Sequence, residues 1–141
     1  MNLPDLAGAF VTFAEAAGLA NTCADSCLAE PDVADLVECI ALDRLVSDSC
    51  ELAGRVLGRR LLVGAEQHVL ALVLAATEAC ATECNRHGTA HAQCTACAAA
   101  CERAATVARA LLDPVGPSGA PLEDPTQKPL VDPGNIQTSG R

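Results

Sequence analysis

The feature that most constrains this chain is a 22-residue segment, residues 80–101, which contains five cysteines and two histidines. These side chains recur at spacings of three or four residues, as C-x3-C, then H-x3-H, then C-x2-C-x3-C. Residues three or four positions apart share one face of an α-helix. Gly88 interrupts the run, and Thr89 is an acceptable N-cap for a second helix. The segment therefore predicts two antiparallel helices joined by a tight turn, with thiols on their facing surfaces.

The same spacing of apolar residues and cysteines runs through the preceding part of the chain. It predicts helices over residues 3–29, 32–57, 61–87 and 89–112. The alanine-rich composition, with two phenylalanines and no tryptophan or tyrosine, also favours helices over sheets. Long helices with short connections are typical of an up-down-up-down bundle. We therefore expect an all-α fold, an antiparallel four-helix bundle over residues 1–112.

Residues 113–141 differ in kind from the rest of the chain. They hold six of the eight prolines and four of the ten glycines, and they show no helical period. Such a composition predicts a disordered C-terminal tail, because it offers too little apolar surface to offset the entropy of ordering. Two short apolar spots, residues 129–131 and 135–136, suggest a tail that docks on a partner or on a neighbouring subunit. An inert tail is the alternative.

Charge and hydropathy exclude several classes of function. The net charge is −9, and Lys128 is the single lysine, so the chain should repel nucleic acid and anionic membranes. The first residues lack the basic region of a secretory signal, and the longest apolar stretch, residues 69–76, is too short to span a bilayer. These features predict a cytoplasmic location. Thiols stay reduced there, so nine cysteines indicate metal binding rather than a disulfide framework.

Eight of the nine cysteines should meet at one end of the bundle, because each lies a short helical distance from the same set of turns. Two histidines should lie at the mouth of that end, either as an acceptor site for incoming metal or as ordinary surface residues. Cys50 lies farther along its helix and should pack as a small apolar group. We interpret the following residues as candidate metal ligands: Cys23, Cys27, Cys39, Cys80, Cys84, His87, His91, Cys94, Cys97 and Cys101.

The ligand type narrows the choice of metal. Thiolates select Cu(I), Zn(II) or iron–sulfur clusters. Zinc sites usually present C-x2-C pairs on turns, whereas the pair here, Cys94 and Cys97, lies within a predicted helix. Rows of thiols along helix faces suit Cu(I), which accepts two or three sulfurs and bridges readily. A zinc or iron–sulfur module of the same architecture is the alternative.

No residues in the sequence form an activated nucleophile or an acid–base pair, so we predict that the protein is not an enzyme. The acidic residues Asp43, Glu78 and Glu83 are expected on solvated faces. The predicted third helix is apolar on several faces, with Val69, Leu72 and Ala76 away from its core stripe. A helix that is apolar on several sides is usually covered on more than one of them. This pattern predicts a homo-oligomer that associates through the third helix.

The segment E-C-N-R-H-G-T-A-H-A-Q-C-T-A-C-A-A-A-C, which begins at Glu83, resembles the signature hairpin of the bacterial copper storage proteins. Cys23, Cys27, Cys39 and Cys50 fit the first hairpin of that family more loosely. The resemblance implies a four-helix bundle whose core cysteines bind Cu(I), a histidine-bearing mouth, frequent assembly as tetramers, and membership of the cytosolic branch.

Members of that family carry more cysteines along the core than this chain does. The inward positions here are instead expected to hold Leu42, Val46, Leu70, Val73 and Thr77. The resemblance therefore predicts copper storage or buffering by a reduced cysteine set. A structural or interaction bundle that has lost most of its metal capacity is the alternative.

Overall fold

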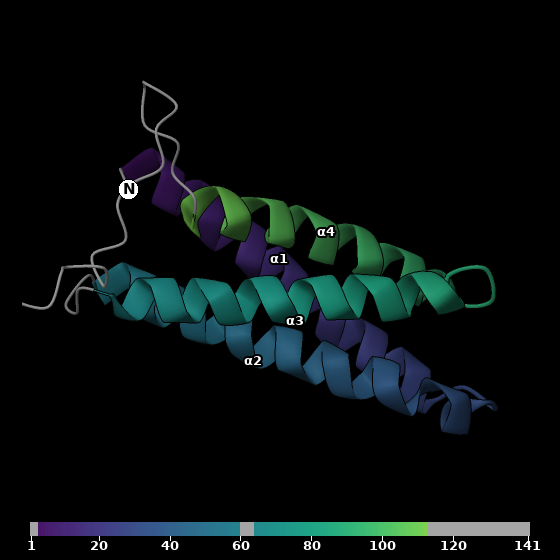
Figure 1. Cartoon of the computed structure of the whole chain (residues 1–141). Helices are drawn as coiled ribbons and strands as arrows, with labels where there is room; N and C mark the ends of the chain where they lie inside the picture. The colour runs from purple at the N-terminus through teal and green to yellow at the C-terminus, as the bar shows by residue number, and fades with distance from the viewer. Residues whose placement is uncertain (1–2, 60–63, 113–141) are drawn as a thin grey trace, which may run out of the picture.

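The computed structural model describes residues 3–59 and 64–112, which form four α-helices and one short 3-10 helix (Figure 1). The helices are α1 (Leu3–Leu28), α2 (Val37–Arg59), α3 (Ala65–His87) and α4 (Ala92–Leu112), and the 3-10 helix η1 (Val33–Leu36) precedes α2. Residues 60–63, where the third helix was expected to begin, and the predicted tail, residues 113–141, lie outside the described residues.

The four helices close into a ring in which each packs against the two that flank it, in the order α1, α2, α3, α4 and back to α1. Neighbouring helices run in opposite directions, and the α3–α4 turn lies at the same end of the bundle as the connection from α1 to α2 (Figure 1). This arrangement confirms the all-α, antiparallel, up-down-up-down bundle. None of the described helices is both long and apolar enough to cross a membrane.

The core is built mainly from small side chains, and its two ends differ in chemistry. The predicted stripe of α1 is buried throughout: Leu6, Ala9, Phe13, Ala16, Ala20, Cys23 and Cys27. At the end away from the α3–α4 turn, the core is aliphatic and aromatic and includes Phe13, Leu57 and Leu70. Toward the α3–α4 turn, thiols replace these residues. The bundle therefore has an ordinary apolar half and a sulfur-lined half.

Two expectations about which residues face the core are wrong. On α2, Leu42 is only half-buried, whereas its neighbour Asp43 is completely buried. On α3, Ala76 is 1% exposed and belongs to the core, although the sequence placed it off the stripe. In both helices the other apolar residues and cysteines of the predicted stripe are buried, so the buried face is broader than the stripe rather than displaced from it. Leu72 does lie outside the core, as predicted.

The turn between α3 and α4 differs from the expected one. Thr89 is not the N-cap, because α4 begins at Ala92 and the His91 carbonyl accepts the Cys94 N–H at 3.1 Å. Gly88 follows the last residue of α3 but has a right-handed φ of −60°. A Cβ at this position would lie 2.9 Å from Thr95 Oγ1, so a larger residue would displace the hydroxyl that donates to the Gly88 carbonyl. The turn thus holds the first turn of α4 close against the end of α3.

Candidate metal centre

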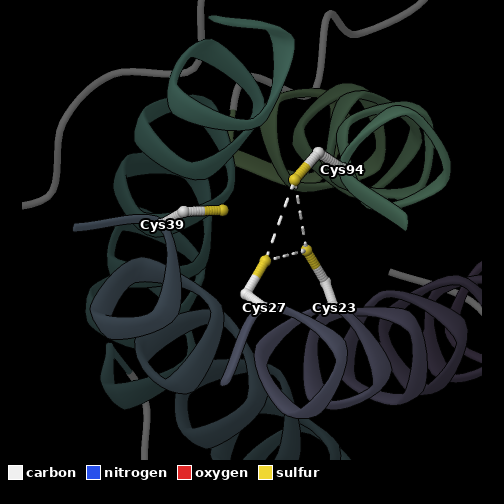
Figure 2. A group of neighbouring side chains, drawn as sticks. All are labelled: Cys23, Cys27, Cys39 and Cys94. Atoms are coloured by element: carbon white, nitrogen blue, oxygen red, sulfur yellow. Dashed lines mark hydrogen bonds between the residues drawn. The ribbon is translucent and has the colours of Figure 1, made fainter. Parts of the chain in front are cut away.

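The nine cysteines are all buried and all free, and eight of them form one continuous set of sulfur contacts. The first part of this set is a triangle. Cys23 and Cys27, one turn apart on α1, and Cys94, from the first turn of α4, place their three sulfurs 3.9 Å from one another (Figure 2). Cys39 of α2 points toward this triangle from the facing side (Figure 2), and its sulfur lies within 4.8 Å of all three.

The second part of the set lies along the facing surfaces of α3 and α4. Cys39 Sγ is 3.5 Å from Cys84 Sγ and so joins the two parts. From Cys84 the contacts continue to Cys80 at 3.8 Å, from Cys80 to Cys97 at 3.9 Å, and from Cys97 to Cys101 at 4.0 Å. The structure thus brings together the eight thiols that the sequence placed at one end of the bundle.

Cys50 stands apart from these eight cysteines. It belongs to none of the clusters of potential ligand atoms among the described residues. It lines a largely apolar groove between α1 and α2 together with Phe10, Phe13 and Gly54. Burial raises the pKa of its thiol to about 12. Its environment is that of a small apolar side chain, as the sequence predicted.

A carboxylate lies in the middle of the second set of thiols, where the sequence analysis expected none. Asp43 Oδ1 accepts hydrogen bonds from the thiols of Cys80 and Cys97, at 3.2 Å each, and Cys84 Sγ lies 3.8 Å away. The side chain is fully buried, so the expectation of a solvated face is wrong. Thiols from α3 and α4, together with Cys39 of its own helix at 3.9 Å from Oδ2, make this burial tolerable, because a buried polar group is costly only when it lacks partners. A signal did exist, since Asp43 follows Cys39 by one helical turn.

The protonation of this centre follows from its burial. Burial, together with the nearby Cys80 and Cys23, raises the pKa of Asp43 to about 9. Burial is also the main reason that the pKa values of the Cys27 and Cys94 thiols lie above their ordinary value. Hydrogen bonds from neighbouring thiols, with Cys39 the main partner of Cys23 and Cys101 the main partner of Cys80, instead hold the pKa values of Cys23 and Cys80 below the ordinary value. Without metal, Asp43, Cys27 and Cys94 therefore hold their protons at neutral pH. A cation that binds here must displace them, so binding is coupled to pH.

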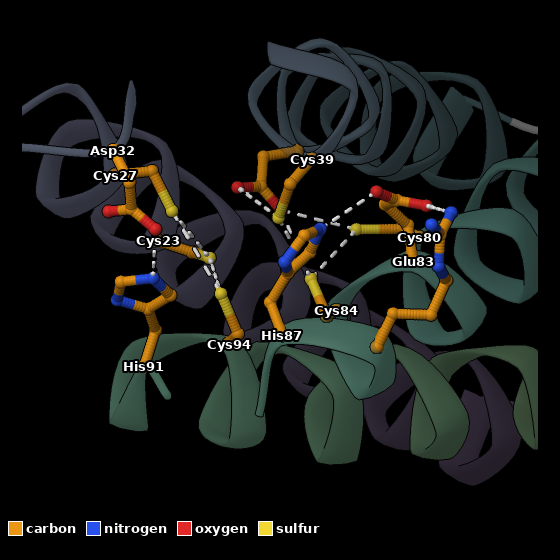
Figure 3. Close-up of polar contacts among 12 residues, drawn as sticks. Cys23, Cys27, Asp32, Cys39, Cys80, Glu83, Cys84, His87, His91 and Cys94 are labelled. Atoms are coloured by element: carbon orange, nitrogen blue, oxygen red, sulfur yellow. Dashed lines mark hydrogen bonds and ion pairs between the residues drawn. The ribbon is translucent and has the colours of Figure 1, made fainter. Parts of the chain in front are cut away.

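The two candidate histidines lie at the end of the bundle that carries the α3–α4 turn, and each pairs with carboxylates (Figure 3). His87 Nε2 is 3.0 Å from Glu83 Oε1, and Arg86 Nη1 is 2.9 Å from Glu83 Oε2. These two partners explain why Glu83 is 7% exposed, contrary to the solvated position expected for it. Glu78, by contrast, is about half exposed, at 49%, and pairs with Arg109, as a solvated acid would.

His91 joins the start of α4 to the connection between α1 and η1. Its Nε2 lies 3.1 Å from Asp32 Oδ2 and its Nδ1 lies 3.3 Å from Glu30 Oε1. The hydrogen bond with Asp32 raises the pKa of His91, and the same contact lowers the pKa of Asp32. Among the described residues, no group of three or more potential ligands combines a histidine with a cysteine. The sequence analysis did not foresee Glu30 and Asp32 as partners.

The described residues therefore offer two kinds of ligand set. One kind is sulfur-rich and buried. It includes a group of four cysteines, at positions 23, 27, 39 and 94, and an overlapping group formed by Cys23, Asp43, Cys84 and Cys97. The other is the partly exposed group of Glu30, Asp32 and His91. The first is suited to soft, thiophilic ions, and the second to harder ions or to a proton.

Comparison with known proteins gives a consistent result. The sequence profile of the copper storage protein family (Csp) matches residues 9–113. A search of curated proteins gives no match. A cytosolic copper storage protein from Streptomyces lividans, solved with five coppers, is 33% identical, with 77% of this chain and 92% of that chain covered and a TM-score of 0.75.

Two further solved structures are similar. The Streptomyces lividans protein Ccsp loaded with 10 copper equivalents is 33% identical over 77% of this chain and 84% of that chain, with a TM-score of 0.75. The Cu(I)-bound copper storage protein BsCsp3 is 30% identical over 77% of this chain and 98% of that chain, with a TM-score of 0.70. The matched residues span most of the bundle, including all of the cysteine-lined half. This chain belongs to the copper storage protein family.

Proposed function

We propose that this protein binds and stores Cu(I) through the thiolates of its core. The observation that carries the proposal is the set of eight buried sulfurs, supplied by all four helices, whose neighbours lie 3.5 to 4.0 Å apart within each part and within 4.8 Å where Cys39 meets the triangle. Soft thiolates select Cu(I) over harder cations. Its solved relatives in the same family hold copper, which supports the same cargo here.

The spacing of the sulfurs suggests how copper would be held. Neighbouring thiolates at these distances can each bridge two ions, so that a row of sulfurs along facing helices supports a row of copper ions. The proposed sulfur ligands are Cys23, Cys27, Cys39, Cys80, Cys84, Cys94, Cys97 and Cys101. Asp43 lies among the second set, where its side chain can supply an oxygen ligand once its own proton has left.

The proposed store is confined to one half of the bundle. The inward positions beyond the thiols hold Val46, Leu70, Val73 and Thr77, all completely buried and none a thiolate. The Thr77 hydroxyl donates to the Val73 carbonyl at 2.7 Å, so it is already used within its own helix. We therefore propose a buffer of modest capacity rather than a core filled along its whole length.

The histidines are proposed as the acceptor site for incoming copper. His87 uses Nε2 for Glu83, which leaves Nδ1 open to a metal ion. His91 has a carboxylate at each ring nitrogen, so it must give up one of them to bind copper. Both lie at the end of the bundle where the thiol set begins, which supports a role in passing the ion inward.

A titration with Cu(I) under anaerobic conditions, against a competing chelator, tests the proposed function. Cys84→Ala should lower the number of tightly bound copper ions, because Cys84 joins the two parts of the sulfur set. Cys50→Ala is the matched control, since it removes a buried thiol that touches no other cysteine sulfur. Equal losses in the two variants would contradict a store confined to one half, and the absence of tight Cu(I) binding by the unaltered chain would refute storage.

We also propose that the protein acts without catalysis, in the cytoplasm, and as a homo-oligomer. The Streptomyces lividans relative is described as cytosolic, and reduced thiols require such a compartment. Oligomer formation is supported by the leucines on the outer faces of α2 and α3, where Leu45, Leu52 and Leu72 are 40 to 41% exposed. A monomeric mass in sedimentation equilibrium would contradict this part of the proposal.

A further inference from the structure

We propose that Cys23, Cys27, Cys39 and Cys94, here called the mouth tetrad, form a mononuclear tetrathiolate site that takes a divalent cation of the zinc class when Cu(I) is absent. The tetrad joins α1, α2 and α4. It contacts the rest of the sulfur set through Cys39, whose sulfur lies 3.5 Å from Cys84 Sγ, but it differs from the neighbouring group around Asp43 because its four ligand atoms are all sulfur.

The geometry of the mouth tetrad fits a single ion. Three of its sulfurs form an equilateral triangle with edges of 3.9 Å (Figure 2). A regular tetrahedron with edges of this length has its centre about 2.4 Å from each vertex, close to the usual zinc–thiolate bond length of about 2.3 Å. The sulfur of Cys39 lies within 4.8 Å of the other three and faces them, so it supplies the fourth vertex of a tetrahedron. Small rotations about the side-chain bonds are enough to close the site.

The composition of the tetrad also separates it from the deeper thiols. All four of its ligand atoms are sulfur, and all four residues are completely buried. Four thiolates in a closed tetrahedral array are the usual ligands of a structural zinc ion. Deeper in the bundle, Asp43 Oδ1 lies 3.2 Å from the sulfurs of both Cys80 and Cys97 and 3.8 Å from Cys84 Sγ, so the potential ligand atoms there include an oxygen. That arrangement suits several bridged ions rather than one.

Helix ends support the negative charge that such a site carries. Four thiolates around one divalent cation leave a net charge of −2. Cys39 is the third residue of α2 and Cys94 is the third residue of α4, so both lie in the first turn of a helix. The first turn carries about half a unit of positive charge, which favours the thiolate form of a cysteine placed there. Two helices thus direct their positive ends toward the tetrad, whereas Cys27, in the last turn of α1, lies at a negative helix end that offsets part of this effect.

An equilibrium titration with divalent ions alone tests this proposal and does not depend on Cu(I) binding. The full-length, fully reduced apo protein is titrated with Zn²⁺ against a chromophoric chelator. We expect one tightly bound Zn²⁺ per chain. Cys94→Ala should weaken binding at least about 100-fold, because it removes one of four ligands. Cys50→Ala is the matched control, because it removes a buried thiol that belongs to no ligand cluster, and it should leave the affinity unchanged. Circular dichroism checks that both variants are folded.

Co²⁺ provides a second readout that needs no variant. In the unaltered protein, it should show sulfur-to-metal charge-transfer bands and the intense visible bands of tetrahedral coordination. A spectrum without charge-transfer bands would overturn the proposal. So would an equal loss of Zn²⁺ affinity in Cys50→Ala. Loss of binding in His91→Ala, with binding retained in Cys94→Ala, would place the ion at the carboxylate–histidine group instead and would equally overturn it.

Discussion

At the scale of single residues, Asp43 is the side chain that most changes the description of the metal centre, which the sequence analysis based on cysteines and histidines alone. A carboxylate buried among thiols would be costly if it were left unpaired, but Cys80 and Cys97 donate to it from α3 and α4. Its pKa rises to about 9 mainly because of burial. The residue therefore keeps a proton in the apo fold, and that proton has to leave when a cation and its thiolates occupy the core.

The raised pKa of Asp43 makes the apo fold less stable as the pH rises. The folded chain keeps a proton on this carboxyl up to about pH 9, while the unfolded chain loses it near its ordinary value of 3.8. The stabilisation is therefore complete below about pH 4 and is lost at about 1.4 kcal/mol per pH unit as the pH rises toward 9. Asp43→Asn should remove this slope.

Urea unfolding of the apo protein at about pH 5 and pH 7 measures the effect. The free energy of unfolding should fall by up to about 3 kcal/mol more in the unaltered chain than in Asp43→Asn. Parallel pH profiles for the two chains would show that Asp43 is ionised in the folded state.

The eight clustered thiols could be predicted from sequence because they repeat at helical spacing, and spacing is a local property. The burial of Asp43 and Glu83 could not be read in the same way. Both depend on partners: Asp43 on thiols from other helices, and Glu83 on the way Arg86 and His87 fold back onto it. The general rule that acidic side chains face solvent therefore gives a wrong prediction whenever hydrogen-bond or ion-pair partners compensate for burial. The one-turn spacing from Cys39 to Asp43 was the available signal.

At the scale of elements, the helices were predictable to within a few residues and the α3–α4 turn was not. Helix α4 begins three residues later than expected, because Thr95 folds back onto the Gly88 carbonyl and residues 88–91 form the turn. As a result, His91 precedes α4 and reaches Glu30 and Asp32, instead of lying on the inner face of the helix. The turn therefore sets which groups line the mouth of the bundle.

Changing both mouth histidines tests the role of this turn. His87→Ala combined with His91→Ala should slow Cu(I) loading, because the ion loses its first ligands, but the final number of bound ions should hardly change. His68→Ala, which removes an exposed histidine of α3, is the control and should load at the normal rate. Stopped-flow mixing with a Cu(I) donor complex measures the rate. If the double variant loads as fast as the control, the two histidines are structural groups that hold the turn.

At the scale of the whole molecule, the fold follows from four periodic segments and short connections, and the main contacts between the described helices fall between neighbours in the ring. The predicted boundary at residue 112 stays a prediction, because residues 113–141 lie outside the described part of the chain. The composition of these residues does not identify a partner to which they would bind. Family membership came from the cysteine and histidine pattern of one hairpin, and the match over residues 9–113 confirms it.

Removing the tail tests the boundary. A chain that ends at Asp113 should keep the helicity, the melting temperature and the Cu(I) stoichiometry of the full chain, because the ring of helices is closed without it. Circular dichroism and Cu(I) titration are sufficient to check this. A drop in melting temperature or in copper capacity would make the tail part of the domain. Loss of a co-purifying partner alone would support a docking role.

The measurement that tests the central claim most directly is the location of copper in the loaded protein. Crystals of the Cu(I)-loaded chain would give anomalous difference peaks at the copper absorption edge. The account predicts that the core peaks lie among the eight clustered thiols and Asp43, with none beside Cys50, which is surrounded by apolar groups. Copper distributed along the whole core as far as Cys50, or held only by the histidines and carboxylates at the mouth, would contradict it.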